Sequence, residues 1–469
     1  MKRVHLVGIG GTGLSAIAVV LLERGVQVSG SDRQLSPLAQ RVQAAGGQVF
    51  VGHRAENIIG ADLVVRSSAI PDDNIEVQAA LQAGVPVYRR VDFLGLLTSG
   101  YRTIAVAGTH GKTTTTAMIA WLLAFAGQDP SYIIGGVSVN LGGNAHHGRG
   151  DIFVIEADEY DGMFLGLNPE IAVVTNIEHD HPDCYPTGEA FYQAFAAFSE
   201  RILPQGVLLG CLDDAGVTRL LQQAAGRPYR VLAYGGREAA SDYWMSALSE
   251  TQGAGVSFRA TGSVAEGQQA DLTLQVPGRH NALNALAALA VADLLGIDWA
   301  SAAPALASFQ GTGRRFDLRG TAQGVTVIDD YAHHPTEIRA TLAAARSRYP
   351  GQAIWAVWQP HTYSRTRLLA GQFAAAFVDA DHVLVLAIYA AREPAPADGF
   401  SAGQVLAEMK HPDARYIPGI PQAQEYLLSH LQPGSVVLVL SAGDADLLSG
   451  SLFDALEKAG LAANRSKPA

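Results

Sequence analysis

Apolar runs of two lengths alternate along the chain and indicate its secondary structure. The short run 4–7 precedes a glycine-rich turn, and the longer apolar stretch 14–22 follows that turn. The same order recurs where the run 102–106, a second glycine turn and the stretch 117–123 follow one another. Short apolar runs are typical of buried strands and long ones of buried helices, so the pattern predicts an α/β protein with parallel sheets.

The last third of the chain repeats this arrangement. Four apolar runs, at 325–328, 353–357, 383–386 and 436–440, each end in polar residues. Because the carboxyl ends of parallel strands lie at one edge of a sheet, these polar residues should converge on a common site. With 469 residues the chain is too long for a single hydrophobic core, and its length predicts two to four domains.

Composition and charge restrict the classes of partner. The formal net charge of −11 argues against nonspecific binding to nucleic acid or to an anionic membrane, because both need a basic surface. Two cysteines, Cys184 and Cys211, are too few for a disulfide framework and fit a reducing compartment. The sequence has no signal-peptide pattern and no apolar run that could span a bilayer. We therefore expect a cytoplasmic protein whose partners are small molecules, with no nucleic acid and no membrane among them.

The glycine turn after residues 102–106 carries a lysine and several threonines. A strand, a tight turn and a helix start bring backbone N–H groups and the positive end of a helix dipole to one point, where a phosphate chain can bind. Lys112 would then neutralise the terminal phosphates, and the hydroxyl of Thr113 would hold Mg2+. The alternative is an ordinary turn with a solvated lysine, but the flanking elements favour a phosphate loop. Its residues are Gly108, Thr109, His110, Gly111, Lys112, Thr113 and Thr114.

The first glycine turn has the spacing G-x-G-x-x-G, and Asp32 follows the next predicted strand. This pattern is typical of dinucleotide-binding domains, so NAD is one candidate ligand. A nucleotide sugar is another, because its diphosphate can approach the same backbone and its hydroxyl groups can meet the same carboxylate. Asp32 could instead be a turn or helix-cap residue. The candidate binding residues are Gly8, Gly10, Gly11, Thr12, Gly13 and Asp32.

Carboxylates and histidines follow two predicted strands in the middle of the chain. The run 151–155 ends in Glu156, and the run 171–175 is followed by Asn176 and His181. Opposite a lysine loop, such a group indicates a site for Mg2+ and phosphate, because hard oxygen ligands suit this ion. Histidine is a less usual ligand of Mg2+. A solvated acidic rim would explain either segment alone and explains both together less well.

These segments and several others, taken in order, resemble the Mur ligase family over essentially the whole chain. A single segment is weak evidence, whereas the order of all of them is specific. The resemblance rests on GIGGTG at 8–13, SSAI at 67–70, GTHGKTT at 108–114, EADE at 156–159, TNIEHDH at 175–181, GRHNALN at 278–284, RRF at 314–316, DDYAHHPTE at 329–337 and QPH at 359–361.

The resemblance implies a fold and a reaction. It implies three α/β domains, each with a mainly parallel sheet: a Rossmann-like domain (1–99) for a UDP-sugar, a P-loop ATPase-like domain (100–312) for ATP and Mg2+, and a Rossmann-like domain (313–469) for an amino acid. It also implies an ATP-dependent ligase of peptidoglycan precursor synthesis. This enzyme phosphorylates the lactyl carboxylate of UDP-N-acetylmuramate and joins the acyl phosphate to L-alanine, giving ADP and phosphate. Its expected state is a monomer or a homodimer.

Residue roles also follow from the resemblance, position by position. It places Lys112 at the γ-phosphate, Thr113 and Glu156 at one Mg2+, and His181 at a second Mg2+. The remaining assignments are His280 and Asn281 at the adenine, Arg315 at a phosphate, Asp329 or Asp330 at the ribose, His333 and Arg365 at the carboxylate of L-alanine, and Ser67 and Ser68 with the first glycine turn at the UDP-sugar. Lys112, His181, His333 and Arg365 are the expected catalytic residues.

Three alternatives stay open at this point. A sister ligase would attach a preformed peptide to the same sugar nucleotide, although the residues at 8–11 and 389–393 favour the alanine ligase. An NAD-dependent oxidoreductase would use the first glycine turn but would leave the lysine loop and the metal carboxylates unexplained. A noncatalytic nucleotide-binding scaffold would have kept the domains and lost the chemistry.

Overall fold

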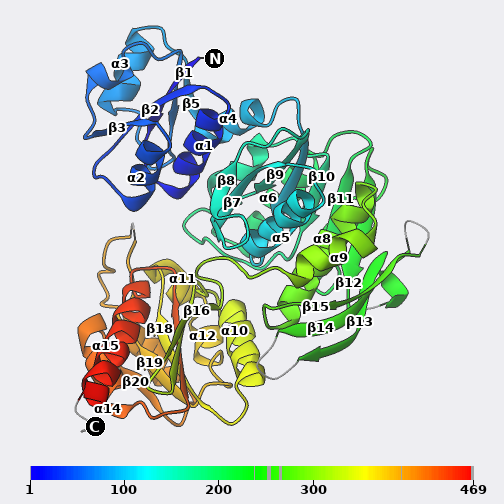
Figure 1. Cartoon of the computed structure of the whole chain (residues 1–469). Coiled ribbons are helices and arrows are strands. Elements are labelled where there is room, and N and C mark those ends of the chain that lie inside the picture. The colour runs from blue at the N-terminus through cyan, green and yellow to red at the C-terminus, as the bar shows by residue number, and fades with distance from the viewer. Residues whose placement is uncertain (1, 237, 251–254, 264–266, 392, 466–469) are drawn as a thin grey trace.

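The computed structural model describes residues 2–236, 238–250, 255–263, 267–391 and 393–465, so Arg392 of the segment 389–393 lies outside the described residues. Its strands form three separate sheets, one in each successive part of the chain, and helices pack against each sheet (Figure 1). This architecture confirms the predicted fold class of three α/β units with mainly parallel sheets. Among the described residues, no helix combines the length and the apolar character needed to cross a bilayer.

The N-terminal sheet has five parallel strands in the order β3-β2-β1-β4-β5. The direction of strand order changes at β1, and in open parallel sheets ligands bind beyond the carboxyl end of the strand at this position. The strands are β1 (Arg3–Val7), β2 (Gln27–Asp32), β3 (Gln48–Val51), β4 (Leu63–Arg66) and β5 (Val87–Arg89), and the helices are α1 (Thr12–Glu23), α2 (Pro37–Ala44), α3 (Ile75–Gln82) and α4 (Arg90–Leu97).

A buried glutamate, Glu76 at the start of α3, ties the elements of this sheet together. Its carboxylate accepts hydrogen bonds from the hydroxyl of Ser31 on β2, from the side-chain amide of Asn57 and from the backbone N–H of Arg54. Burial alone would raise the pKa of Glu76, but hydrogen bonds from His5, Ser31 and Asn57 outweigh burial and lower it to about 2. Glu76 is therefore a structural carboxylate that stays ionised.

The central sheet has ten strands in the order β15-β14-β13-β12-β11-β10-β6-β9-β7-β8, with antiparallel pairs only toward its two ends. Its strands are β6 (Arg102–Ala107), β7 (Ser131–Ser138), β8 (Gly143–His146), β9 (Ile152–Glu156), β10 (Ile171–Val174), β11 (Val207–Cys211), β12 (Arg230–Gly235), β13 (Tyr243–Glu250), β14 (Val256–Gly262) and β15 (Gln269–Thr273). Its helices are α5 (Lys112–Phe125), α6 (Gly188–Ser199), α7 (Ala215–Gln223), α8 (Arg279–Leu294) and α9 (Trp299–Ala307).

Helices α5 and α8 pack against each other over the middle of this sheet. Twelve of the sixteen residues of α8 are buried and six of these are alanine, so the helix is apolar almost all round and comes close to α5. This packing brings the second turn of α8 to the phosphate loop, because a Cβ atom at Gly111 would lie 2.9 Å from Oδ1 of Asn284.

The C-terminal sheet has six strands in the order β16-β17-β21-β18-β19-β20, and β16 is the antiparallel one. Its apolar faces form two core clusters, one under α10, α12 and α13 and one under α14 and α15. The strands are β16 (Asp317–Ala322), β17 (Val325–Asp330), β18 (Ala353–Gln359), β19 (His382–Val385), β20 (Ala414–Tyr416) and β21 (Ser435–Ser441), and the helices are α10 (Pro335–Arg348), α11 (Tyr363–Leu368), α12 (Ala370–Ala374), α13 (Ala402–Glu408), α14 (Ile420–His430) and α15 (Asp446–Arg465).

Candidate functional site

The phosphate loop between β6 and α5 has a backbone that requires its glycines. Gly108 has φ +140°, and a Cβ atom there would lie 2.0 Å from the hydroxyl oxygen of Thr175. Gly111 has φ +79°, a left-handed conformation that side chains rarely adopt. The two glycines therefore let the chain pass against β10 and turn directly into the first turn of α5.

The segment after β10 fixes the shape of this loop. The backbone N–H of His110 donates to Oδ1 of Asn176 at 2.7 Å, and the hydroxyl of Thr175 donates to the carbonyl of His110 at 2.6 Å. The backbone N–H of Glu178 donates to the hydroxyl of Thr109 at 2.9 Å. The loop is thus held in place by side chains that follow a neighbouring parallel strand, as the strand-end argument predicts.

Lys112 points back over the loop to which it belongs. Its Nζ lies 2.9 Å from Oε2 of Glu159 and donates to the carbonyl of Thr109 at 3.1 Å. Burial alone would lower the pKa of Lys112, but the carboxylates of Glu159, Asp158 and Glu156 together outweigh burial and raise it. The lysine is therefore a fixed positive charge beside the loop.

Thr113 and Glu156 form the oxygen pair that the sequence assigns to Mg2+. The hydroxyl of Thr113 donates to Oε1 of Glu156 at 3.0 Å, and the N–H of Gly135 donates to Oε2 at 2.6 Å. Burial raises the pKa of Glu156, so a cation placed here would favour its charged form. A hydroxyl and a carboxylate beside a phosphate loop have the donor chemistry that suits Mg2+.

His181 lies at the edge of the same group. Its Nε2 is 3.5 Å from Oε1 of Glu159, so His181 and Lys112 share this carboxylate. Burial alone would lower the pKa of His181, but the carboxylates of Asp180 and Glu159 together outweigh burial and raise it.

A cavity extends from the phosphate loop to the C-terminal sheet. His280, Asn281 and Arg315 line it, together with apolar side chains such as Leu283 and Val276. Arg315 also pairs with Glu337, whose carboxylate lies 3.2 Å from its Nη1. A cavity lined by both apolar and polar side chains suits a nucleoside phosphate.

Of the two adjacent aspartates on β17, Asp330 lines this cavity, whereas Asp329 does not. Successive side chains of a strand point to opposite faces, and Asp329 is directed to the other face, where Nη2 of Arg319 donates to it at 2.8 Å. Of the two candidate ribose ligands, Asp330 is therefore the one whose carboxylate faces the cavity. Burial raises the pKa of Asp330 to about 6.

Arg365 and His333 lie together, as predicted, around a carboxylate that the sequence-based assignment left out. Nε of Arg365 donates to Oδ1 of Asp180 at 2.5 Å, although 185 residues separate them, and the pair is almost completely buried. Nε2 of His333 is 3.9 Å from Oδ2 of the same aspartate. Burial lowers the pKa of His333 to about 3, so its imidazole is neutral at pH 7.

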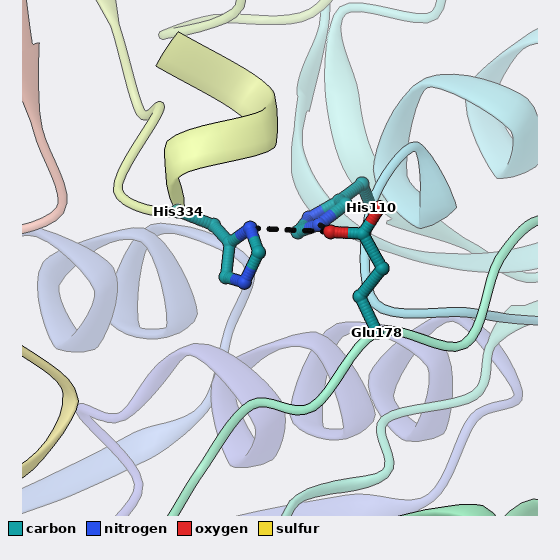
Figure 2. A group of neighbouring side chains, drawn as sticks. All are labelled: His110, Glu178 and His334. Atoms are coloured by element: carbon teal, nitrogen blue, oxygen red, sulfur yellow. Dashed lines mark hydrogen bonds and ion pairs between the residues drawn. The ribbon is translucent and has the colours of Figure 1, made fainter. Parts of the chain in front are cut away.

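A second contact between the central and C-terminal parts surrounds Glu178. Figure 2 shows its carboxylate beside the imidazoles of His110, in the phosphate loop, and His334, the residue before α10. The hydroxyl of Thr336 donates to the same carboxylate at 2.6 Å. Burial alone would lower the pKa of His110, but Glu178 and Glu337 outweigh burial and raise it to about 9.

The N-terminal glycine turn lies between β1 and α1, in the N-terminal part of the chain, and is closed by Asp32. The backbone N–H of Gly10 donates to Oδ2 of Asp32 at 2.9 Å, so this carboxylate orders the turn itself. A Cβ atom at Gly8 would lie 3.1 Å from Cβ of Ser67, which places that serine beside the turn, and Ser68 is exposed. Gly11, Thr12 and Gly13 lead from the turn into α1.

The sequence-based assignment also left out Arg90, which links the glycine turn to the phosphate-loop region. A Cβ atom at Gly13 would lie 1.8 Å from Nη1 of Arg90, so the guanidinium covers the start of α1. Its Nη2 is 3.4 Å from Asp158, next to Glu159 in the chain. The sequence shows only an arginine that follows a short apolar run. That its guanidinium reaches Gly13 is evident only from the folded structure.

Comparison with known proteins identifies the family. Three family models match successive parts of the chain: "Mur ligase family, catalytic domain" over residues 3–102, "Mur ligase middle domain" over 106–292 and "Mur ligase, glutamate ligase domain" over 314–443. The UDP-N-acetylmuramate–L-alanine ligase of Renibacterium salmoninarum is 46% identical over 456 residues, which are 97% of this chain and 96% of that protein. The ligase of the same name from Thermobifida fusca is 46% identical over 464 residues, 97% of each chain.

Solved structures agree with this result. The UDP-N-acetylmuramate–alanine ligase MurC of Thermotoga maritima has a TM-score of 0.80 at 28% identity, with 98% of this chain and 100% of that chain covered. A murein peptide ligase of Psychrobacter arcticus has a TM-score of 0.72 at 26% identity, with 97% and 99% covered. The chain therefore belongs to the Mur ligase family.

Proposed function

We propose that this protein is an ATP-dependent ligase that joins L-alanine to the lactyl carboxylate of UDP-N-acetylmuramate, with release of ADP and phosphate. The observation that carries this conclusion is the 46% identity, over 97% of the chain, to ligases of that name. An NAD-dependent oxidoreductase is rejected, because all three parts of the chain match models of Mur ligases. A cytoplasmic location remains a prediction from the sequence, as does the choice between monomer and homodimer.

The first half of the reaction is phosphoryl transfer. The lactyl carboxylate attacks the γ-phosphorus of ATP, the bond from that phosphorus to the bridging oxygen breaks, and ADP leaves. Lys112 is held by Glu159 beside the loop backbone and stabilises the charge on the transferring phosphoryl group. The glycines of the loop let its backbone N–H groups face the phosphates.

Thr113 and Glu156 are the proposed ligands of Mg2+, and His181 is proposed for a second ion. When bound, Mg2+ supplies positive charge to the phosphate oxygens. The contact between Thr113 and Glu156 supports the first assignment. The contact of His181 with Glu159, which also holds Lys112, supports its place near the transferring phosphate.

The second half of the reaction is amide formation. The amine of L-alanine attacks the acyl carbon, the bond from that carbon to the phosphate oxygen breaks, and the new amide nitrogen loses a proton. Arg365 uses Nε for Asp180 and Nη1 for Nδ1 of His361, and Nη2 remains directed toward the His181 side, where it can bind the alanine carboxylate. Neutral His333 can donate one further hydrogen bond.

ATP is proposed to occupy the cavity between the central and C-terminal sheets. His280 and Asn281 flank the adenine, Arg315 reaches a phosphate, and Asp330 takes the ribose hydroxyls in place of Asp329, because Asp330 faces the cavity. The glycine turn with Asp32, Ser67 and Ser68 binds the UDP-sugar. We keep 1–99, 100–312 and 313–469 as the proposed domains for the UDP-sugar, ATP and the amino acid.

The test is phosphate release from ATP and Mg2+ in the presence of UDP-N-acetylmuramate, with L-alanine, other amino acids or a tripeptide as acceptor. Release that depends on L-alanine and yields the amide supports the proposal. Release only with the tripeptide would move the assignment to a peptide ligase, the function named for the Psychrobacter arcticus structure. No release with any acceptor would favour the noncatalytic scaffold.

A further inference from the structure

Three potential metal ligands of two chemical kinds meet between the central and C-terminal parts of the molecule. They are His110 in the phosphate loop, Glu178 after β10 and His334 at the N-cap of α10, and one ligand atom from each lies within 4.8 Å of the others. Oε2 of Glu178 is 3.4 Å from Nε2 of His110 and 3.5 Å from Nδ1 of His334 (Figure 2). The three side chains come from distant segments and point to one place.

These distances are long for hydrogen bonds and suit a shared cation. Hydrogen bonds from nitrogen to oxygen are usually about 2.7–3.2 Å. In a tetrahedral zinc site, metal bonds of about 2.0–2.1 Å place neighbouring ligand atoms about 3.3–3.4 Å apart. We propose that His110, Glu178 and His334 bind one Zn2+ or a similar transition-metal ion, with a water molecule as the fourth ligand.

The surroundings orient these ligands as a metal site requires. Oε1 of Glu337 lies 3.4 Å from Nδ1 of His110, so a carboxylate faces the ring nitrogen that an ion on Nε2 would leave unbound. The hydroxyl of Thr336 donates to Glu178 at 2.6 Å and fixes the third ligand. Nδ1 of His334 accepts the N–H of Thr336 at 3.3 Å, a long hydrogen bond that the ion would replace.

The ligand chemistry separates this site from the proposed Mg2+ site. Mg2+ prefers oxygen ligands, such as those of Thr113 and Glu156, whereas two imidazoles with a carboxylate select zinc and its neighbours. His110 and Glu178 belong to the central part and His334 to the C-terminal part. A bound ion would therefore connect the two parts at the wall of the cavity that His110 and Glu178 line.

The test uses the full-length chain, treated with chelator, dialysed, and titrated with Zn2+ in excess Mg2+ while a chromophoric chelator competes. We expect one Zn2+ per chain, a higher melting temperature with Zn2+, and visible absorption bands of a four-coordinate site with Co2+. Loss of an outer partner of a metal ligand lowers affinity about 10–100-fold, so loss of a ligand should lower it at least about 100-fold. The variants are Glu178→Gln, which keeps the side-chain shape, and His334→Asn.

His334→Asn removes the imidazole and keeps a good N-cap residue for α10, so it separates loss of the metal from loss of the helix. His430→Asn is the matched control, because His430 is an exposed imidazole at the end of α14 and its removal should leave Zn2+ affinity unchanged. The proposal is overturned if the native chain binds no Zn2+, or if folded Glu178→Gln and His334→Asn both bind it as the native chain does. Loss of binding in Glu156→Gln alone would place the ion at the Mg2+ site and would equally overturn it. These binding tests do not depend on the ligase reaction.

Discussion

Replacement of Lys112 by methionine should remove activity and also destabilise the central domain, and a second substitution should separate the two effects. Nζ of Lys112 lies 2.9 Å from Oε2 of Glu159, whose side chain is 1% exposed. At an effective dielectric constant of about 20, unit charges at this distance attract by about 6 kcal/mol, and the cost of burying them offsets part of this. Loss of one partner of such a pair typically costs about 3–5 kcal/mol, because the other charge is left buried alone.

We therefore expect Lys112→Met to lower the free energy of unfolding of the central domain by about 3–5 kcal/mol. Adding Glu159→Gln removes the isolated carboxylate and should restore most of that loss. It should not restore turnover, because a missing fixed charge at the transferring phosphate costs at least about 100-fold to 1000-fold in rate. Initial rates of phosphate release, together with hydrogen exchange of the α5 amides in urea, measure the two quantities separately.

An exposed pair in the same sheet provides the control. Nη2 of Arg102 lies 2.8 Å from Oε1 of Glu170, but both side chains are about a third or more exposed. Arg102→Met should cost less than about 1 kcal/mol and leave turnover unchanged. Phosphate release by Lys112→Met/Glu159→Gln above a tenth of the native rate would refute the role of the lysine. Equal stability of Lys112→Met and the native chain would refute the electrostatic argument.

Three further predictions concern residues outside the reacting groups. The pKa of Glu76 is lowered to about 2 from its usual 4.5, so its contribution of about 3 kcal/mol is present above pH 4.5 and is lost as the pH falls toward 2. The stability difference between the native chain and Glu76→Gln in urea should therefore shrink from pH 6 to pH 3, and a constant difference would contradict the assignment. A Cβ atom at Gly135 would lie 2.6 Å from both carboxylate oxygens of Glu156. Gly135→Ala should therefore raise the Mg2+ concentration for half-maximal rate at least about 10-fold. An unchanged Mg2+ dependence would count against this metal site. The indole N–H of Trp299 donates to the carbonyl of Leu289, whereas that of buried Trp358 has no hydrogen-bond partner among the described residues. Trp299→Phe should therefore lower the free energy of unfolding by about 1 kcal/mol more than Trp358→Phe, as measured by thermal unfolding. Equal costs would refute that difference.

Local sequence patterns predicted the parts of the site that lie within one strand-turn-helix unit. The phosphate loop could be located because Gly108, Gly111 and Lys112 stand between a strand-like run and a helix-like stretch, and each signal is local. The α/β class followed from the same alternation. The antiparallel strands β13 to β15 were not predicted, because their pairing depends on neighbours rather than on an apolar run of their own.

The parts that could not be predicted depend on orientation or on long-range contact. Asp329 and Asp330 are adjacent and chemically identical, and only the face of β17 decides which one enters the cavity. Arg365 was expected to hold a substrate carboxylate, but no local pattern indicates that Asp180, 185 residues away, binds its Nε. Similarly, Arg90 becomes noticeable only after folding places it over Gly13.

The segment 175–181 is where these long-range contacts combine. Toward the phosphate loop, Asn176 binds the backbone of His110 and Glu178 binds Thr109. Toward the C-terminal sheet, the carboxylate of Glu178 accepts from Thr336, and Asp180 pairs with a buried arginine. The same seven residues therefore hold the nucleotide loop by backbone and amide groups and hold the amino-acid region by carboxylates. A shift of either neighbour must be accommodated by this segment, because the carboxylate of Asp180 is too buried to exchange its arginine partner for water without a large cost. The physical connection between the phosphate-transfer and amide-forming halves of the site thus passes through a strand end that contributes His181 to the proposed Mg2+ site and Glu178 to the proposed transition-metal site.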